Sequence, residues 1–278
     1  MNRNLQEIVE WRGVEGLVAA EVLVDDNETG EGHGYVTGDV FAIAGVAEIS
    51  KSIDSSSEAH YYDNIPAVVI QGNGPDTITI SASAIPMDVH AELLGQYYDD
   101  DLGAMVEGDP VQKYFAVGYI TEKTNGDKVY VWRHKGTFAM SDQTNSTKNN
   151  GTDANGQELV YTGISTTHKF TKTGKPAKGI NVDLGKDLAD VSTFFDEVTT
   201  IDTLVGKTAY TLTITQAADT TVTVKKNGAA LATGATIHAG DQLQITVTGG
   251  TVTVGGVAFT SGDIHVVTGN TTVVSTKT

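Results

Sequence analysis

Hydrophobic and polar residues alternate with a period of two over much of this chain, a pattern that predicts strands rather than helices. The clearest example is residues 113–138, KYFAVGYITEKTNGDKVYVWRHKGTF, where two such runs flank residues 124–127. Asn125 and Gly126 favour a tight hairpin, because a type I′ turn needs positive φ at both central residues. The stretch therefore predicts a long antiparallel hairpin at the centre of a β domain.

The alternation gives each arm of this hairpin an apolar face and a mixed face. The residues expected to share faces are Phe115, Val117 and Tyr119 on the first arm, and Val129, Val131 and Arg133 alternating with Tyr130, Trp132 and His134 on the second. Tyr130 and Trp132 are expected to belong to a core rather than to a ligand platform.

Upstream of the hairpin, residues 17–24, 35–49 and 76–84 have the alternation of strands. Residues 50–73, SKSIDSSSEAHYYDNIPAVVIQGN, have little periodicity, and we expect a long loop there with a short strand near 68–70. Loops longer than about 12–15 residues are uncommon in compact domains and tend to be functional.

Two segments predict helical or irregular structure. Residues 85–95, IPMDVHAELLG, change period, with Pro86 suited to a first turn and Gly95 to a helix end. Val89, Leu93 and Leu94 form the apolar stripe of this predicted flanking helix.

The second segment, residues 180–204, predicts a short helix around 186–198 or an arm. Its large apolar side chains are Leu184, Leu188, Phe194 and Phe195.

The last part of the chain differs in kind, being rich in Thr and Gly with no Trp or Pro. Short predicted strands at 211–215, 221–225, 242–248, 251–254 and 265–267 are separated by Gly-containing turns. Regularly spaced short strands are typical of a small immunoglobulin-like β-sandwich. The predicted fold is mainly β, a larger β domain over residues 1–204 with one or two short helices and a smaller one over 205–278.

The two predicted domains carry very different charge. The whole chain has a net charge of −17, while residues 205–278 contain four Lys and three Asp, which leaves −18 on residues 1–204. An acidic surface disfavours binding of nucleic acid, since affinity for phosphates requires Lys and Arg. Ordinary solubilising charge is the simpler interpretation of this sequence alone.

Composition narrows the class of protein further. There are no cysteines, so no disulfide framework or thiolate site is expected. We find no run near the roughly 20 apolar residues of a membrane span, and no secretory segment follows Met1. We therefore expect a protein without a membrane partner that is assembled in a cytoplasm.

The search for catalytic or metal-binding residues gives no convincing constellation. The seven His are scattered outside known ligand spacings, and no nucleophile or phosphate-loop motif is present. Residues 25–28, DDNE, and 99–101, DDD, are interpreted as solvated acidic loops rather than cation sites. We expect no enzyme activity, no metal and no cofactor.

Several short motifs, in this order, carry a resemblance. YYDNIP at 61–66 precedes a polar strand, which runs into AELLG at 91–95 and is followed by YFAVGY at 114–119 and VYVWRHKGTF at 129–138. This arrangement resembles the major tail proteins, or tail tube proteins, of long-tailed phages with non-contractile tails. The resemblance covers residues 5–200.

The resemblance implies a structural virion protein with a tail-tube β-sandwich or barrel fold. Such proteins form hexameric rings that stack into a tube, through which double-stranded DNA passes without specific binding at ejection. Partners would be other copies of the chain and the tape-measure, tail-terminator and distal tail proteins. The bore of such tubes is usually acidic, which would give the charge of residues 1–204 a purpose.

The resemblance also implies roles for particular residues. A ring-stacking loop would contain Ile53, Tyr61, Tyr62, Asp63, Asn64 and Ile65; an inter-subunit arm would contain Leu184, Leu188, Phe194 and Phe195; and the central hairpin would be marked by Asn125, Gly126, Tyr130 and Trp132. Residues 205–278 would be an immunoglobulin-like decoration outside the tube, with the host cell surface as a candidate partner.

The alternative function is a monomeric β-sandwich that binds glycans at a cell surface. It predicts a shallow platform of exposed aromatic side chains, for example Tyr61, Tyr62 or Trp132 together.

Overall fold

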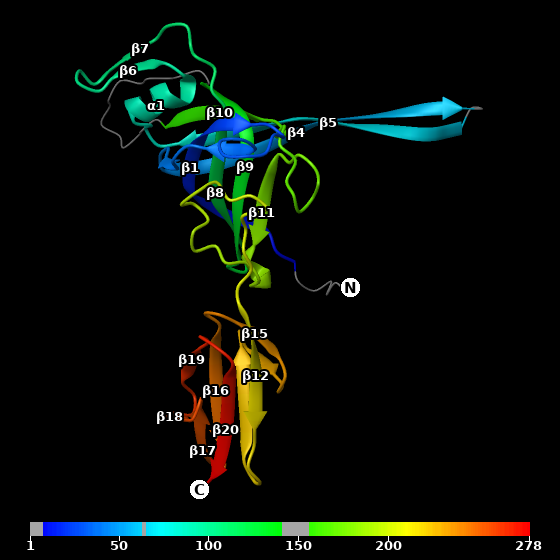
Figure 1. Cartoon of the computed structure of the whole chain (residues 1–278), viewed down its shortest axis with the longest axis vertical. Helices are drawn as coiled ribbons and strands as arrows, with labels where there is room; N and C mark the ends of the chain where they lie inside the picture. Colours follow the sequence, from blue (N-terminus) through cyan, green and yellow to red (C-terminus); the bar gives the residue numbers. More distant parts are fainter. Residues whose placement is uncertain (1–7, 63–64, 141–155) are drawn as a thin grey trace, which may run out of the picture. The chain divides into compact units, whose positions relative to one another are not determined.

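The computed structural model describes residues 8–62, 65–140 and 156–278. The chain divides into two compact units, unit 1 (Met1–Leu204) and unit 2 (Val205–Thr278), each with its own sheets and core (Figure 1). The structure is mainly β, as the alternation of polar and apolar residues predicts.

Unit 1 contains eleven named strands and one α-helix among its described residues. They are β1 (Trp11–Asp25), β2 (Tyr35–Thr37), β3 (Phe41–Ala42), β4 (Val46–Tyr62), β5 (Ile65–Ala82), α1 (Met87–Leu94), β6 (Tyr97–Asp99), β7 (Ala104–Val106), β8 (Phe115–Lys123), β9 (Lys128–Met140), β10 (Gln157–Gly163), β11 (Gly179–Asp183) and the 3₁₀ turn η1 (Leu184–Lys186).

One large sheet organises unit 1, with the strand order β2-β1-β8-β9-β10-β5-β4. The first half of β9 pairs with β11 and the second half with β10, and its register with β8 shifts between Phe115 and Val117. Such a bulge bends and twists a strand. The bend in β9 therefore marks the place where the sheet changes partners and curves around its core.

The central hairpin predicted from the sequence is confirmed as β8 and β9, but its turn is not type I′. Gly126 has φ +88°, whereas Asn125 is outside the left-handed region. The Gly126 N–H donates to the Lys123 carbonyl, and the Lys123 N–H donates to the Asp127 carbonyl. This pattern belongs to a three-residue loop in which a type I turn is followed by a left-handed glycine.

The concave face of the sheet encloses the main core of unit 1. Side chains from β1, β5, β8, β9, β10 and α1 meet there, and Phe115, Phe138 and Tyr161 pack edge to face or tilted against one another. The Tyr161 hydroxyl donates to the Phe115 carbonyl at 2.9 Å, so its polar atom is satisfied within the core. An added Cβ at Gly136 would lie 2.4 Å from the Tyr161 ring, so this β9 position accommodates no side chain.

The opposite face of β8 and β9 is covered by the segment that follows β11. Trp132 is fully buried there, and its indole N–H donates to the Phe194 carbonyl at 2.9 Å. The Phe195 ring stacks on Tyr130, with centroids 5.6 Å apart, and Phe194 meets Tyr130 edge to face. Tyr130 and Trp132 thus belong to a core, as their alternation predicts.

Of the two alternatives for residues 186–198, a short helix or an arm, the helix is wrong: beyond η1 the segment has no helix and forms turns at residues 192–198. In an α-helix the Phe194 carbonyl would accept from a backbone N–H one turn later. Here it accepts from the Trp132 indole and the Thr199 hydroxyl instead. The apolar side chains of the segment therefore cover the sheet without forming a helix.

The flanking helix is confirmed as α1. Leu93 is buried in the main core, and Val89 and Leu94 pack against it partly buried. Gly95 ends the helix in the left-handed conformation, with φ +64°. Residues 97–106, which include the run DDD predicted as a solvated acidic loop, form the short hairpin β6–β7 beside α1.

Unit 2 is a β-sandwich of two sheets. Its strands are β12 (Ala209–Thr215), β13 (Thr221–Lys226), β14 (Ala229–Leu231), β15 (Thr236–His238), β16 (Gln242–Thr248), β17 (Gly250–Val254), β18 (Val257–Phe259), β19 (Ile264–Val266) and β20 (Thr271–Lys277). The orders β15-β12-β20-β17-β18 and β14-β13-β16-β19 face a common apolar core that includes Leu212, Ile245 and Val273. No helix in the described part of the chain is long and apolar enough to cross a membrane.

Replacing Phe194 with Ala should destabilise unit 1 by about 3–5 kcal/mol, because a buried aromatic side chain is removed. Urea unfolding followed by Trp fluorescence measures this, since Trp11 and Trp132 both lie in unit 1. Leu188→Ala, on the same segment but 57% exposed, is the matched control and should change stability by less than about 0.5 kcal/mol. Equal effects of the two substitutions would contradict the packing described here.

Candidate functional site

The β4–β5 hairpin extends beyond the body of unit 1 (Figure 1). β10 pairs with β5 only from Asp76 to Ala82, so the distal part of β5 pairs with β4 alone. Ile53 and Ile65 on this hairpin are 54% and 65% exposed. Two large apolar side chains are thus presented to solvent on a long two-stranded ribbon.

The expected loop at residues 50–73 is therefore wrong, and so is the single short strand near 68–70. Backbone pairing continues from Val46↔Ala82 to Tyr62↔Ile65, with three irregularities. Ile53 and Ile65 are exposed rather than buried, and a strand without a buried face has no period of two imposed on it, which explains the weak pattern. Of the other residues predicted here, Tyr61 and Tyr62 lie in β4, while Asp63 and Asn64 fall outside the described residues.

A buried carboxylate anchors the base of this hairpin. Asp76 is 3% exposed and forms ion pairs with Lys178 at 2.8 Å and Lys51 at 3.0 Å. Lys178 also donates to the Gly74 carbonyl. Burial alone would raise the pKa of the Asp76 carboxyl, but the hydrogen bonds and charges of the two lysines outweigh burial and lower it. No local pattern predicts this cluster, apart from the position of Asp76 at the start of an apolar strand.

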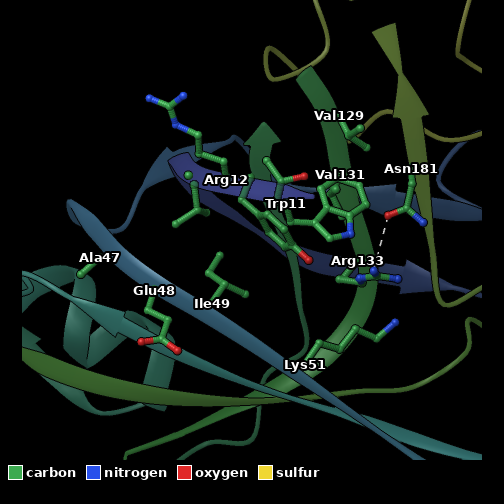
Figure 2. A pocket seen from close by; sticks show the side chains of 14 residues that line it. Trp11, Arg12, Ala47, Glu48, Ile49, Lys51, Val129, Val131, Arg133 and Asn181 are labelled. Atoms are coloured by element: carbon green, nitrogen blue, oxygen red, sulfur yellow. Dashed lines mark hydrogen bonds between the residues drawn. The ribbon is translucent and has the colours of Figure 1, made fainter. Parts of the chain in front are cut away.

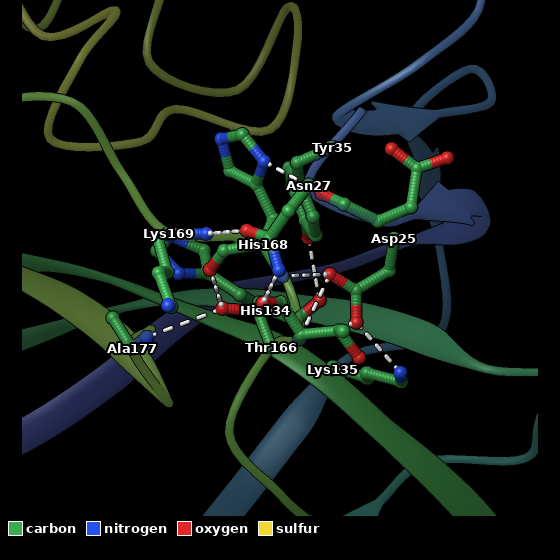
Figure 3. A network of polar contacts seen from close by, with 11 residues as sticks. Asp25, Asn27, Tyr35, His134, Lys135, Thr166, His168, Lys169 and Ala177 are labelled. Atoms are coloured by element: carbon green, nitrogen blue, oxygen red, sulfur yellow. Dashed lines mark hydrogen bonds and ion pairs between the residues drawn. The ribbon is translucent and has the colours of Figure 1, made fainter. Parts of the chain in front are cut away.

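A second polar network fastens the end of β1 to the segment after β10 (Figure 3). The Asp25 carboxylate accepts from the backbone N–H groups of Thr167 and His168 and pairs with Lys135 at 2.6 Å. Burial acts to raise the pKa of Asp25, and these hydrogen bonds lower it further than burial raises it. The interpretation of residues 25–28 as a solvated acidic loop is therefore wrong for Asp25.

His134 is buried beside this network. Its ring lies 5.6 Å from the Tyr35 ring and 5.1 Å from the Phe170 ring, and its Nε2 lies 3.3 Å from the Thr199 carbonyl. The Tyr35 hydroxyl donates to the His134 carbonyl at 2.5 Å. Burial among these groups lowers the pKa of His134 to about 4, so the imidazole is neutral at neutral pH.

The segment predicted as an inter-subunit arm packs largely on its own chain. Phe194 is buried, and Phe195 and Leu184 are partly buried against the same sheet face. Leu188 is 57% exposed. Contact with another subunit remains a prediction for this segment.

A polar, hydroxyl-rich face lies on β10, β5 and β4. Thr162 is the register neighbour of Thr137 on one side and Thr77 on the other, and Thr77 is followed by Ser52. These side chains lie opposite the buried side chains of β5 and β10, such as Ile78 and Ile80. We call this surface the hydroxyl face.

An open groove of about 660 Å³ lies between β1 and β4 (Figure 2). These strands stand near the two ends of the strand order and approach each other without pairing, which leaves a space between them. Its apolar lining consists of Trp11, Val14, Ile49, Tyr119, Val129 and Val131. Arg12, Lys51 and Arg133 also line it, whereas Glu48 is its acidic member. No local pattern in the sequence predicts this groove.

Within the described residues, no group of three or more His, Cys, Asp or Glu is arranged to hold a metal ion. In the turn of β6–β7, the Asp99 carboxylate accepts from the backbone N–H groups of Asp101 and Leu102, both at 3.0 Å. Asp99 thus shapes its own turn.

Comparison with known proteins adds one finding. A family model described as phage tail tube protein matches residues 35–211, well over half of the chain. No curated protein matches the chain.

The burial of His134 predicts a pH-dependent stability. Its folded-state pKa of about 4 lies below the unfolded value of about 6.5, so the contribution of the neutral ring is complete above pH 6.5 and is lost as the pH falls toward 4. Unit 1 should lose about 2 kcal/mol between pH 7 and pH 5 in urea titrations. His134→Gln should lack this pH dependence; an unchanged slope would contradict the assignment to His134.

Replacing Asp76 with Asn should loosen the base of the β4–β5 hairpin. Removing the charge leaves Lys51 and Lys178 without their carboxylate, which should cost about 1.5–3 kcal/mol and speed amide exchange at residues 51–54. Glu15→Gln is the control, because the Lys128–Glu15 pair is 41% and 55% exposed and should contribute less than about 1 kcal/mol. Unchanged exchange in Asp76→Asn would show that the cluster does not anchor the hairpin.

Proposed function

Because the chain belongs to the phage tail tube protein family, we propose that it forms hexameric rings, which stack into the tube through which phage DNA is ejected. Membership makes the chain a structural component of a phage tail, associated with other copies of itself and with other tail proteins. The ring, its stacking and the passage of DNA are the proposed steps.

The observation that carries the proposal is the β4–β5 hairpin. β4 stands at the end of the strand order, so one edge of its 17 residues has no partner strand among the described residues. An unpaired edge of this length is a template for pairing with another chain. Ring closure would cover such edges with neighbouring subunits, and the protruding end of the hairpin would reach the next ring.

The residues assigned to ring stacking are those of this hairpin: Ile53, Tyr61, Tyr62, Asp63, Asn64 and Ile65. The exposed side chains of Ile53 and Ile65 support the assignment, because a neighbouring subunit would remove their apolar surface from water. Leu188 is the member of the predicted arm that is free to contact a neighbour in the same way.

The charge of unit 1 supports the passage of DNA. With −18 on residues 1–204, phosphates would meet repulsion rather than binding. The hydroxyl face is the candidate lining of the bore, because its Thr and Ser side chains are polar and carry no positive charge.

Unit 2 would be an immunoglobulin-like decoration outside the tube. Its two-sheet sandwich and its charge of +1 suit a separate accessory that faces solvent and touches the host cell surface. The remaining partners would be the tape-measure, tail-terminator and distal tail proteins, with assembly in the host cytoplasm and a final location in the virion tail.

One residue of the aromatic platform that the glycan-binding alternative predicts is not exposed. Trp132 is fully buried and cannot belong to an exposed aromatic platform. No observation on the described side chains favours this alternative.

Negative-stain microscopy of the concentrated full-length protein tests the proposal. We expect rings or tubes, with the tube becoming narrower but still forming when residues 205–278 are deleted, because unit 1 holds the sheet edges. Discrete monomeric particles at every concentration would contradict the proposal.

A further inference from the structure

The groove between β1 and β4 is locally cationic on a strongly acidic unit. Arg12 and Arg133 form no ion pair with a described carboxylate, whereas Lys51 is paired with Asp76. The Arg133 side chain reaches Asn181 at 3.4 Å, and its buried Nε has no hydrogen-bond partner among the described residues (Figure 2). No described carboxylate balances the charge of either arginine, so this groove is suited to an acidic partner that the chain itself does not supply.

The lining of the groove restricts what that acceptor can be. Trp11, Val14 and Ile49 provide an apolar wall, and Trp11 is 67% exposed. A nucleic-acid backbone would satisfy the arginines but would leave this wall uncovered. A peptide that combines an apolar side chain with carboxylates would satisfy both parts of the groove.

Unit 1 carries such a peptide at the tip of β6–β7. Leu102 is 78% exposed, and it follows the exposed residues Asp100 and Asp101. The Asp99 carboxylate fixes the turn through the N–H groups of Asp101 and Leu102. The tip therefore presents a leucine and two carboxylates in a turn that is already formed, which lowers the entropic cost of docking.

The groove and the tip lie toward opposite ends of unit 1. The groove reaches Thr121 and Val129, which adjoin the β8–β9 turn, whereas β6–β7 packs beside α1 at the other end of that hairpin (Figure 1). Complementary patches on different parts of one subunit form a heterologous contact, which can repeat from copy to copy.

We propose that the β6–β7 tip of one copy docks into the groove of a second copy. Leu102 enters the apolar part of the groove, and Asp100 and Asp101 meet Arg12 and Arg133. This inference rests on the proposed self-assembly and adds to it a specific contact between copies.

Cross-linking tests which residues meet. The chain has no cysteine, so two singly substituted proteins, Ala47→Cys in the groove and Leu102→Cys at the tip, can be mixed and treated with a short bis-maleimide. We expect at least tenfold more mixed dimer than from Ala47→Cys with Leu23→Cys, which replaces an exposed leucine of unit 1 that lines neither surface. Equal yields would overturn the proposal.

Charge reversal tests the electrostatic part. Arg12→Glu should raise the protein concentration needed for assembly at least tenfold, and adding Asp101→Lys to the same chain should restore most of the loss. Lys225→Glu makes the same change of charge in unit 2 and should leave assembly unchanged. Sedimentation at several protein concentrations provides the measurement, with microscopy identifying the product.

The outcomes separate this contact from the proposed function. Tubes formed by Arg12→Glu at the wild-type concentration, without selective cross-linking, would overturn the docking and leave tube formation intact. A wild-type protein that neither assembles nor cross-links would overturn both. If a short DNA duplex at low salt abolished the selective cross-link by occupying the groove, the occupant would be nucleic acid and the docking of the tip would be wrong.

Discussion

The structure of unit 1 depends on a sheet that must be covered on both faces along the β8–β9 hairpin. One face of these strands carries Phe115, Val117 and Val131 into the main core. The other face carries Trp132, whose side chain is shielded from water by Phe194 and Phe195. The turns after β11 provide this cover. In the same contact, the Trp132 indole N–H donates a hydrogen bond to the Phe194 carbonyl.

The second requirement is electrostatic. A unit with an excess of carboxylates stabilises its buried ones by placing lysines against them, as Lys135 does for Asp25 and Lys178 does for Asp76. Each of these pairs joins segments that are distant in the sequence, by 110 and 102 positions. The ion pairs of these lysines therefore join loops and strands within unit 1, and the lysines do not serve as surface charge.

These two requirements explain what the sequence could and could not predict. The central hairpin, α1 and most strands of unit 2 were predictable because each has a local period and local turn residues. The β4–β5 hairpin was missed because its sequence has no period of two, in keeping with the exposure of Ile53 and Ile65. For the turns around Phe194 the sequence left a short helix or an arm open, since apolar spacing alone does not reveal which groups donate to the carbonyls. The Asp25 and Asp76 clusters were missed because their partners are remote in the sequence, and the groove depends on the closeness of β1 and β4, which no local pattern encodes.

The internal use of lysines has a consequence for how copies meet in solution. Lys51, Lys135 and Lys178 are committed to the buried carboxylates of Asp25 and Asp76, so none of these three cations offsets the carboxylates exposed on unit 1. Two such bodies repel each other, but counterions confine that repulsion to a Debye length of about 8 Å at physiological ionic strength. The barrier to joining is thus short-ranged and adjustable by the surrounding salt, so the ionic composition of the medium sets how readily free subunits add to a growing structure.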